Sequence, residues 1–145
     1  MIQPINDSLE VAASLRTVLL RLARELRHEI HSLGVTGGQV SLLVAIEKSP
    51  GITASALAEL ERVSAAAMSG HLKRLEATGL IARTRGTDRR RVGLTLTRDG
   101  TKVLRSVRQK RTAWLTRRLA GLTPSERGAI ERAIEPLQKL LEGAE

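Results

Sequence analysis

The sequence predicts a mainly α-helical fold with one small β-hairpin. Most of the chain carries apolar residues three and four positions apart, which is the period of a helix with one buried face. Residues 80–85 and 91–97 instead alternate apolar and polar side chains, which is the period of a half-exposed strand. The five residues between them begin with Gly86 and end with two arginines. We therefore expect a hairpin with positive charge at its tip.

The first helix is expected to reach from about residue 7 to residue 33. Asp7 or Ser8 can cap its N-terminus, since Glu10 follows Asp7 at capping-box spacing, and Gly34 is suited to end it. An apolar stripe with nearly heptad spacing follows one face: Leu15, Leu19, Leu22, Leu26, Ile30 and Leu33. This stripe either packs only within its own subunit or also contributes to a dimer.

Two shorter helices and a tight turn come next. A helix that begins at Thr36 breaks at Pro50, and Thr53 can cap a second helix over residues 54–60. The small side chain of Ala58 lets that helix pack closely against the helix that follows a three-residue turn. This pattern is typical of a helix-turn-helix unit.

The helix over residues 64–78 has one core-facing side and one small-residue side. Ser64 can cap it and Gly79 can end it. The core side is formed by Met68, Leu72 and Leu75. The opposite side carries small and polar residues, so the chain continues from a helix-turn-helix into a basic hairpin. That order predicts a winged helix-turn-helix, a fold that usually binds DNA.

Two further helices complete the chain. Thr97 can cap the first, which runs to about Ala120 and is expected to point Val103, Val107, Trp114 and Leu115 inward. Thr123 can open the last helix, with Pro124 in its first turn and Glu126 completing a capping box. Its apolar stripe consists of Ile130, Ile134, Leu137 and Leu141.

Positive charge is concentrated in the middle of the chain. The 145 residues include 24 Lys and Arg against 15 Asp and Glu, a net charge of +9. Residues 62–118 hold 16 basic and three acidic residues, so their balance is 16 − 3 = +13 and that of the remainder is 9 − 13 = −4. Such a concentration is typical of proteins that bind a phosphate backbone, although a solvated basic face has the same composition.

Several classes of protein are disfavoured. There is no cysteine, which rules out disulfides, thiolate zinc sites and thiol-based redox sensing in this chain. No apolar run of about 18 residues or signal-peptide pattern occurs, so we expect a cytoplasmic protein that does not enter a membrane. His28 and His31 have metal-ligand spacing but lack a supporting cluster. No catalytic constellation is recognisable, so neither an enzyme nor a metal or cofactor is expected.

Three motifs give the chain a specific resemblance. They are Leu75-Glu76-Ala77-Thr78-Gly79-Leu80-Ile81-Ala82-Arg83, then Asp88-Arg89-Arg90, then Leu94-Thr95-Leu96-Thr97-Arg98-Asp99-Gly100. In type and spacing they resemble the signature of the MarR (multiple antibiotic resistance regulator) family. The resemblance implies a dimer formed by residues 1–34 and 101–145 and a winged helix-turn-helix lobe over residues 35–100, in one continuous domain without a linker.

The resemblance also implies how DNA is bound. Helix 64–78 would enter the major groove as the recognition helix, and the wing, residues 85–91, would enter the minor groove. Arg90 would be the groove-entering arginine, with Asp88 orienting it. Together the expected DNA-contact residues are Ser64, Ala66, Ala67, Ser69, Gly70, Lys73, Arg74, Arg83, Arg85, Asp88, Arg89 and Arg90. The expected dimer contacts are Leu15, Leu19, Leu22, Ile130, Ile134, Leu137 and Leu141.

The sequence therefore predicts a homodimeric DNA-binding transcriptional regulator, most simply a repressor at a near-palindromic operator. The family resemblance adds a small-molecule effector. Without Phe or Tyr, and with Trp114 expected in the core, that effector would be lipophilic rather than stacked on aromatic rings. The alternative is a sequence-tolerant architectural protein of the nucleoid type, because Ala65, Ala66, Ala67 and Gly70 offer few hydrogen bonds to bases.

Overall fold

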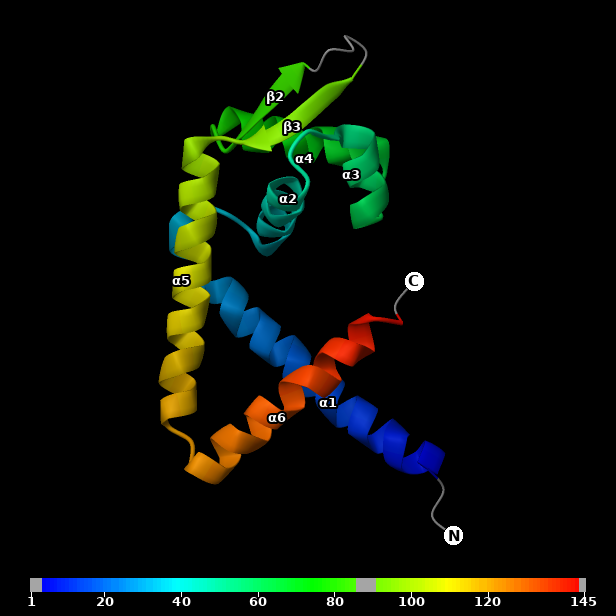
Figure 1. Ribbon diagram of the computed structural model, residues 1–145, viewed down its shortest axis with the longest axis vertical. Helices are drawn as coiled ribbons and strands as arrows, with labels where there is room; N and C mark the ends of the chain where they lie inside the picture. The colour runs from blue at the N-terminus through cyan, green and yellow to red at the C-terminus, as the bar shows by residue number, and fades with distance from the viewer. Residues whose placement is uncertain (1–3, 86–90, 144–145) are drawn as a thin grey trace. The chain divides into compact units, whose positions relative to one another are not determined.

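The computed structural model describes residues 4–85 and 91–143 and confirms a mainly α-helical fold (Figure 1). The chain divides into two compact units, Met1–Arg111 and Thr112–Glu145. The first contains α1 (Pro4–Glu29), a 3₁₀ turn (His31–Leu33), α2 (Gly37–Lys48), β1 (Ile52–Thr53), α3 (Ala54–Glu61), α4 (Ala65–Ala77), β2 (Ile81–Arg85) and β3 (Val92–Leu96). Helix α5 (Arg98–Ala120) begins in the first unit and ends in the second, which also contains α6 (Pro124–Leu141).

The sheet has three antiparallel strands in the order β1-β3-β2, one strand more than the predicted hairpin. β2 and β3 form that hairpin, with Ile81 opposite Leu96 at its base. β1 adds a short edge on the other side of β3, with Ile52 opposite Leu94. Two residues are too few to show an alternating pattern, which is why β1 could not be predicted from periodicity.

One apolar core holds the helices of the first unit against the sheet. Its fully buried large side chains are Ile30, Leu43, Ile46, Leu57, Met68, Leu72, Leu75, Leu94, Leu104 and Val107. Burying each contributes about 1.5–3 kcal/mol relative to exposure. The three core residues predicted for α4 are among them, so the direction in which that helix faces is confirmed.

Most predicted helix caps are confirmed. The side-chain oxygens of Thr53, Ser64, Thr97 and Thr123 each accept a hydrogen bond of 3.0–3.1 Å from the backbone N–H three residues later. The cap predicted for the first helix was wrong, because α1 already includes Pro4 and therefore contains Asp7 and Ser8. Its end was also predicted too late. α1 stops at Glu29, and the chain passes through the 3₁₀ turn before Gly34 adopts a φ of 75°.

Helix α5 departs from the prediction at Leu115. Val107 and Trp114 are buried as expected, but Leu115 is 38% exposed. Leu104, which was not among the residues expected to face inward, is fully buried. Eleven residues, or about three helical turns, separate Leu104 from Leu115, so the two side chains point in nearly the same direction. Leu104 belongs to the core of the first unit, whereas Leu115 lies in the second unit. The prediction that Leu115 faces inward was therefore wrong, because helical periodicity does not show where along the helix the core ends.

Candidate nucleic-acid interface

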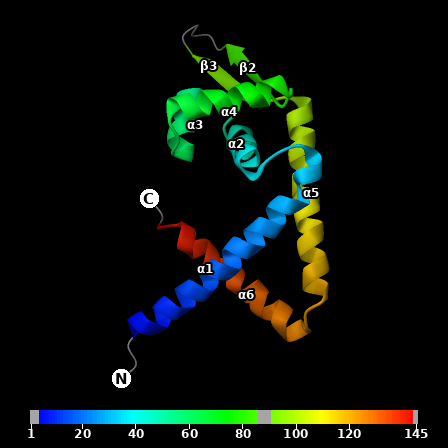
Figure 2. The ribbon, with the colours of Figure 1, turned by 180° about the vertical axis from the view of Figure 1, so that it is seen from behind.

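The orientation of α4 is fixed by its packing against α3. Leu57 and Ala58 of α3 are buried, and so is Met68 of α4. The turn between the helices is closed by the Val63 N–H, which donates to the Ala58 carbonyl oxygen over 3.0 Å. Figure 2 shows α4 running along the sheet with α3 beside its start. The helix-turn-helix predicted from small residues and caps is thus present.

The outer face of α4 is smooth and exposed. Ala66, Ala67, Ser69 and Lys73 are exposed, and Gly70 is half-buried. Ser64 is exposed as well. Its oxygen accepts the capping hydrogen bond from Ala67, which leaves its own hydroxyl hydrogen available as a donor. Small side chains allow close approach to a surface, so this face suits the floor of a DNA groove.

Arg74 lies on a different side of α4 from Ser69. With His71 it borders a hollow of about 360 Å³ between α2 and α4, whose floor includes the buried Met68. Its guanidinium also covers Gly70, with Nη2 3.7 Å from the position that a Cβ would take. The predicted DNA-contact residues on α4 therefore divide into a group on the outer face and one arginine beside α2.

Arg83 has an acidic partner that sequence reasoning missed. Its Nε donates to Oε1 of Glu76 over 2.5 Å, and both side chains remain more than a third exposed. The pair joins the end of α4 to β2. The two residues are seven positions apart, and only the return of the chain from helix to strand brings them together. Arg85, at the end of β2, is exposed.

Asp88, Arg89 and Arg90, the residues predicted for the tip of the wing, lie outside the described residues. The described part of the hairpin ends where Arg85 pairs with Val92. The role of the wing tip in DNA binding accordingly stays a prediction.

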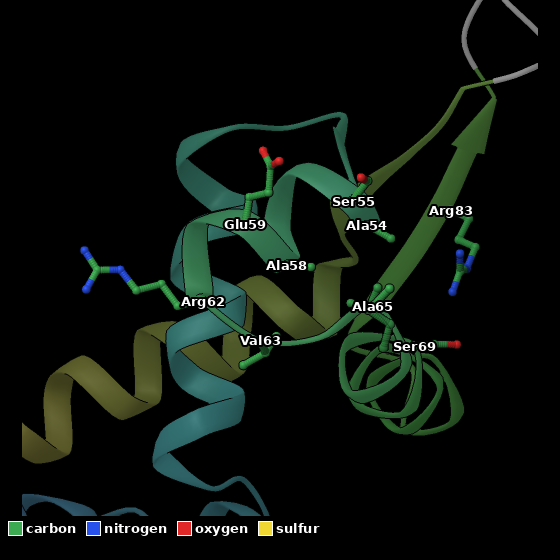
Figure 3. Close-up of a pocket in the computed structure, with 10 residues that line it drawn as sticks. Ala54, Ser55, Ala58, Glu59, Arg62, Val63, Ala65, Ser69 and Arg83 are labelled. Atoms are coloured by element: carbon green, nitrogen blue, oxygen red, sulfur yellow. The ribbon is translucent and has the colours of Figure 1, made fainter. Parts of the chain in front are cut away.

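A hollow of about 450 Å³ opens between α3, α4 and β2 (Figure 3). Its lining combines small or apolar residues with charged ones at the rim: Ala54, Ser55, Ala58, Glu59, Arg62, Val63, Ala65, Ser69, Leu72 and Arg83. In Figure 3, Arg62 and Arg83 lie on opposite sides of this hollow. The outward face of α4 and the hairpin thus border a common concave surface with a cation on either side.

A second ion pair holds α5 to α2. Arg108 donates from Nη2 to Oε1 of Glu47 over 2.6 Å and from Nη1 to Oε2 over 3.3 Å. The hydrogen bonds from Arg108 lower the pKa of the Glu47 carboxyl, and those to Glu47 raise the pKa of the guanidinium. The partners are 61 residues apart, and no sequence signal indicated the pair.

Both terminal helices expose apolar side chains. On α1, Leu19 and Leu22 are 44% and 39% exposed, while Leu15 is half-buried. On α6, the exposed members of the stripe are Ile130, Ile134 and Leu141, with Leu137 half-buried. These are the residues predicted to make a dimer, and the single chain leaves most of them in contact with water.

Other types of site are not found in the parts of the chain that the structure describes. No helix there combines the length and apolar composition required to cross a bilayer. No group of three or more histidine and carboxylate side chains over residues 4–85 and 91–143 is arranged to hold a metal ion.

Comparison with known proteins places the chain among transcriptional regulators. A model of the MarR family matches residues 33–91, the part that contains the helix-turn-helix and most of the hairpin. The transcriptional repressor MdtR of Bacillus subtilis is 31% identical over 137 residues, which cover 94% of this chain and 86% of MdtR. A helix-turn-helix transcriptional regulator of Mycobacterium tuberculosis is 29% identical over 139 residues, covering 95% and 97% of the two chains.

Solved structures with the same fold are also similar to this chain. A candidate transcriptional regulator of Pseudomonas aeruginosa is 35% identical, with a TM-score of 0.80 over 97% of this chain and 99% of that chain. MepR of Staphylococcus aureus, at 18% identity, has the same fold, with a TM-score of 0.76 over 92% and 98% of the two chains.

Proposed function

Because the chain belongs to the MarR family of DNA-binding transcriptional regulators, and is thus not an enzyme, we propose that it acts as a homodimeric repressor. Its operator is a near-palindrome, and the bound dimer blocks polymerase at its own or a neighbouring promoter. The observation that best supports this function is the exposed, small-residue face of α4 next to a basic hairpin. That MdtR, a relative over nearly its whole length, is named a repressor supports the direction of regulation.

In the proposed complex, α4 lies in the major groove. Ala66, Ala67 and Gly70 approach the base edges and contact thymine methyl groups, while Ser64 and Ser69 supply the few hydrogen bonds. Lys73 and Arg85 contact phosphates, which position the protein without reading sequence. A surface with so few base-reading donors takes part of its specificity from DNA shape and deformability.

The wing supplies the second contact. Arg89 and Arg90 are proposed to enter the minor groove at A·T-rich sequence, where the narrow groove has an enhanced negative potential. Asp88 orients Arg90 through an ion pair. Arg90→Ala should therefore lose most affinity on fragments with A·T-rich flanks and least on fragments with G·C-rich flanks, measured by fluorescence anisotropy. Equal binding by the variant and the wild type on both fragments would remove the wing from the mechanism.

The terminal helices support the proposed homodimer. Exposed leucine and isoleucine faces on α1 and α6 are stabilised by burial against a second subunit, and an isologous C₂ arrangement is the commonest outcome. Two recognition helices then meet successive major grooves roughly 34–36 Å apart on one face of the DNA.

A small lipophilic effector is proposed to release the dimer from DNA. The hollow between α3, α4 and β2 supports this, because its floor includes Ala58 and Leu72 and it borders the outer face of α4. A compound that fills it should raise the melting temperature and lower the affinity for DNA together. Compounds that raise the melting temperature of the wild type while leaving DNA affinity unchanged would argue against this route of release.

The competing function is that of a sequence-tolerant architectural protein, which would coat DNA through the basic segment, residues 62–118. Competition binding at physiological salt separates the two functions. A repressor should prefer a fragment carrying its own promoter over random DNA by about 10³ or more. If the two affinities agree within a few-fold, the regulator proposal fails and the architectural one replaces it.

A further inference from the structure

We propose that Arg62, in the turn between α3 and α4, anchors the N-terminal edge of the recognition helix to a DNA phosphate. The inference rests on the proposed function, and it adds a contact residue outside both α4 and the hairpin. Three independent features of Arg62 support it: its backbone conformation, its position at the hollow, and the absence of any other Lys or Arg between Thr53 and Gly70.

The backbone of Arg62 is in a conformation that favours glycine. Its φ and ψ are 55° and 44°, in the left-handed region, and it is the only non-glycine residue with a positive φ in the described parts of the chain. Gly34, Gly51 and Gly79 occupy the other positions of this kind. A residue with a Cβ is less stable here than glycine. An arginine at this position therefore lowers stability for a benefit that lies outside the fold.

The side chain of Arg62 contributes little to the fold that would explain this cost. Its backbone N–H ends α3 by donating to the carbonyl oxygens of Ala58 and Glu59, a bond that glycine would make equally well. The side chain is exposed, and among the described residues its guanidinium has no hydrogen-bond or ion-pair partner. In Figure 3 it extends outward from the end of α3.

Arg62 borders the same hollow as the outer face of α4. Ala65 and Ser69 of α4 line that hollow with it, and Arg83 stands on the opposite side. Arg83 is paired with Glu76 and is thus partly neutralised. Arg62 lies two residues before Ser64, the cap of α4, so it accompanies the end of the helix that reads the groove.

Arg62 is also the lone positively charged residue of its part of the chain. Between Thr53 and Gly70, a stretch that includes all of α3 and the N-terminal half of α4, Arg62 is the only Lys or Arg. The other cations near the interface lie on the C-terminal half of α4 or on the hairpin. Without Arg62, neither α3 nor the N-terminal half of α4 would offer a lysine or arginine to the phosphate backbone. A phosphate contact at this edge holds the smooth helix face in register.

Three substitutions at one position separate charge from backbone strain. Arg62→Ala removes the charge and keeps the left-handed strain, Arg62→Gly removes both, and Arg62→Lys keeps the charge. Arg16→Ala, an exposed arginine on α1, is the control for a loss of net charge. Affinity for a genomic fragment selected by the wild type is measured by anisotropy at several salt concentrations, and melting temperature by circular dichroism.

We expect Arg62→Ala and Arg62→Gly to bind the fragment about tenfold more weakly, and the slope of log affinity against log salt to fall by about 1. Arg62→Lys and Arg16→Ala should stay within about twofold of the wild type. Arg62→Gly should melt about 2–4 °C above Arg62→Ala, so weaker binding cannot be attributed to unfolding.

The inference is overturned if Arg62→Gly binds the selected fragment with the affinity and salt slope of the wild type. This outcome leaves the proposed function intact. Failure of the proposed function is seen separately, as a wild type that does not prefer the selected fragment over random DNA.

Discussion

The cations of the basic segment differ residue by residue in how much of their charge faces solvent unpaired. Arg83 donates to Glu76 and Arg108 donates to Glu47, so each is partly neutralised within the fold. Lys73 and Arg85 are exposed on the surface that includes the outer face of α4 and the hairpin. A balance of +13 in the sequence therefore overstates the charge available to DNA, and the structure shows which residues account for the difference.

The pair between Glu47 and Arg108 predicts a pH dependence of stability. Arg108 lowers the pKa of Glu47 below its ordinary value of 4.5. A carboxyl with a depressed folded-state pKa stabilises the fold above its unfolded pKa, and this contribution is lost as pH falls through the folded value. Both side chains are more than a third exposed, so the pair is worth about 1 kcal/mol or less.

Glu47→Gln should therefore be slightly less stable than the wild type at pH 7, with the difference shrinking below about pH 4.5. Urea unfolding at pH 7, 5 and 3 measures this, and Glu131→Gln on the exposed surface of α6 serves as the control. A difference between wild type and Glu47→Gln that stays constant from pH 7 to pH 3 would show that the pair does not titrate as described.

Among the elements, the junction of α5 with the sheet depends on a close backbone approach. The Thr97 N–H donates to the Leu80 carbonyl oxygen over 3.1 Å, and the Thr97 hydroxyl donates to that of Gly79. A Cβ at Gly100 would lie only 2.0 Å from the Leu80 oxygen. Gly100, the last residue of the motif that begins at Leu94, is thus required for the first turn of α5 to reach the sheet.

Gly100→Ala should destabilise the protein by about 2–4 kcal/mol, since backbone atoms must move to admit the methyl group. Gly38→Ala is the matched control. A Cβ at that helical position would meet only Thr36 Oγ1, at 3.9 Å, so the variant should be neutral or more stable by up to about 1 kcal/mol. Denaturant unfolding of both variants measures these differences in stability. Equal unfolding midpoints for Gly100→Ala and Gly38→Ala would contradict the close approach of Gly100 to the Leu80 oxygen.

Features that depend on neighbouring residues could be predicted from the sequence, whereas features that depend on contacts between distant residues could not. Caps such as Ser64 and Thr123 were predictable because the hydrogen bond joins residues three apart. The start of α1 was not, because Pro4 can occupy a first turn and the later Asp7 only resembled a cap. The ion pair between Glu47 and Arg108 spans 61 residues, and only the packing of α5 on α2 brings its two members together. No periodic pattern in the sequence pointed to Arg62, because its proposed role is inferred from its positive φ angle, which only the structure shows.

At the scale of the whole molecule, the exposed apolar faces of the two terminal helices support the proposed dimer. Ile134 on α6 is 51% exposed and Leu141 is 76% exposed, which favours burial in an assembly. A charge placed in such a face would have to be buried without a partner when two subunits meet, and this opposes association.

Ile134→Glu should therefore shift the protein from dimer to monomer at micromolar concentration, and its affinity for the operator should fall with it. Ser125→Glu places the same charge on α6 about half a helical turn away from the apolar face, and it should remain dimeric. Sedimentation velocity distinguishes the two species. A wild type that sediments as a single subunit would remove the dimer from the account.

Hydroxyl-radical footprinting on a genomic fragment selected by the wild type tests most directly whether paired recognition helices read DNA. Two paired recognition helices should give two protected patches on one face of the duplex, related by a two-fold axis and centred one helical turn apart, about 10–10.5 base pairs. Uniform protection along the fragment, or a single patch without a symmetric counterpart, would contradict it.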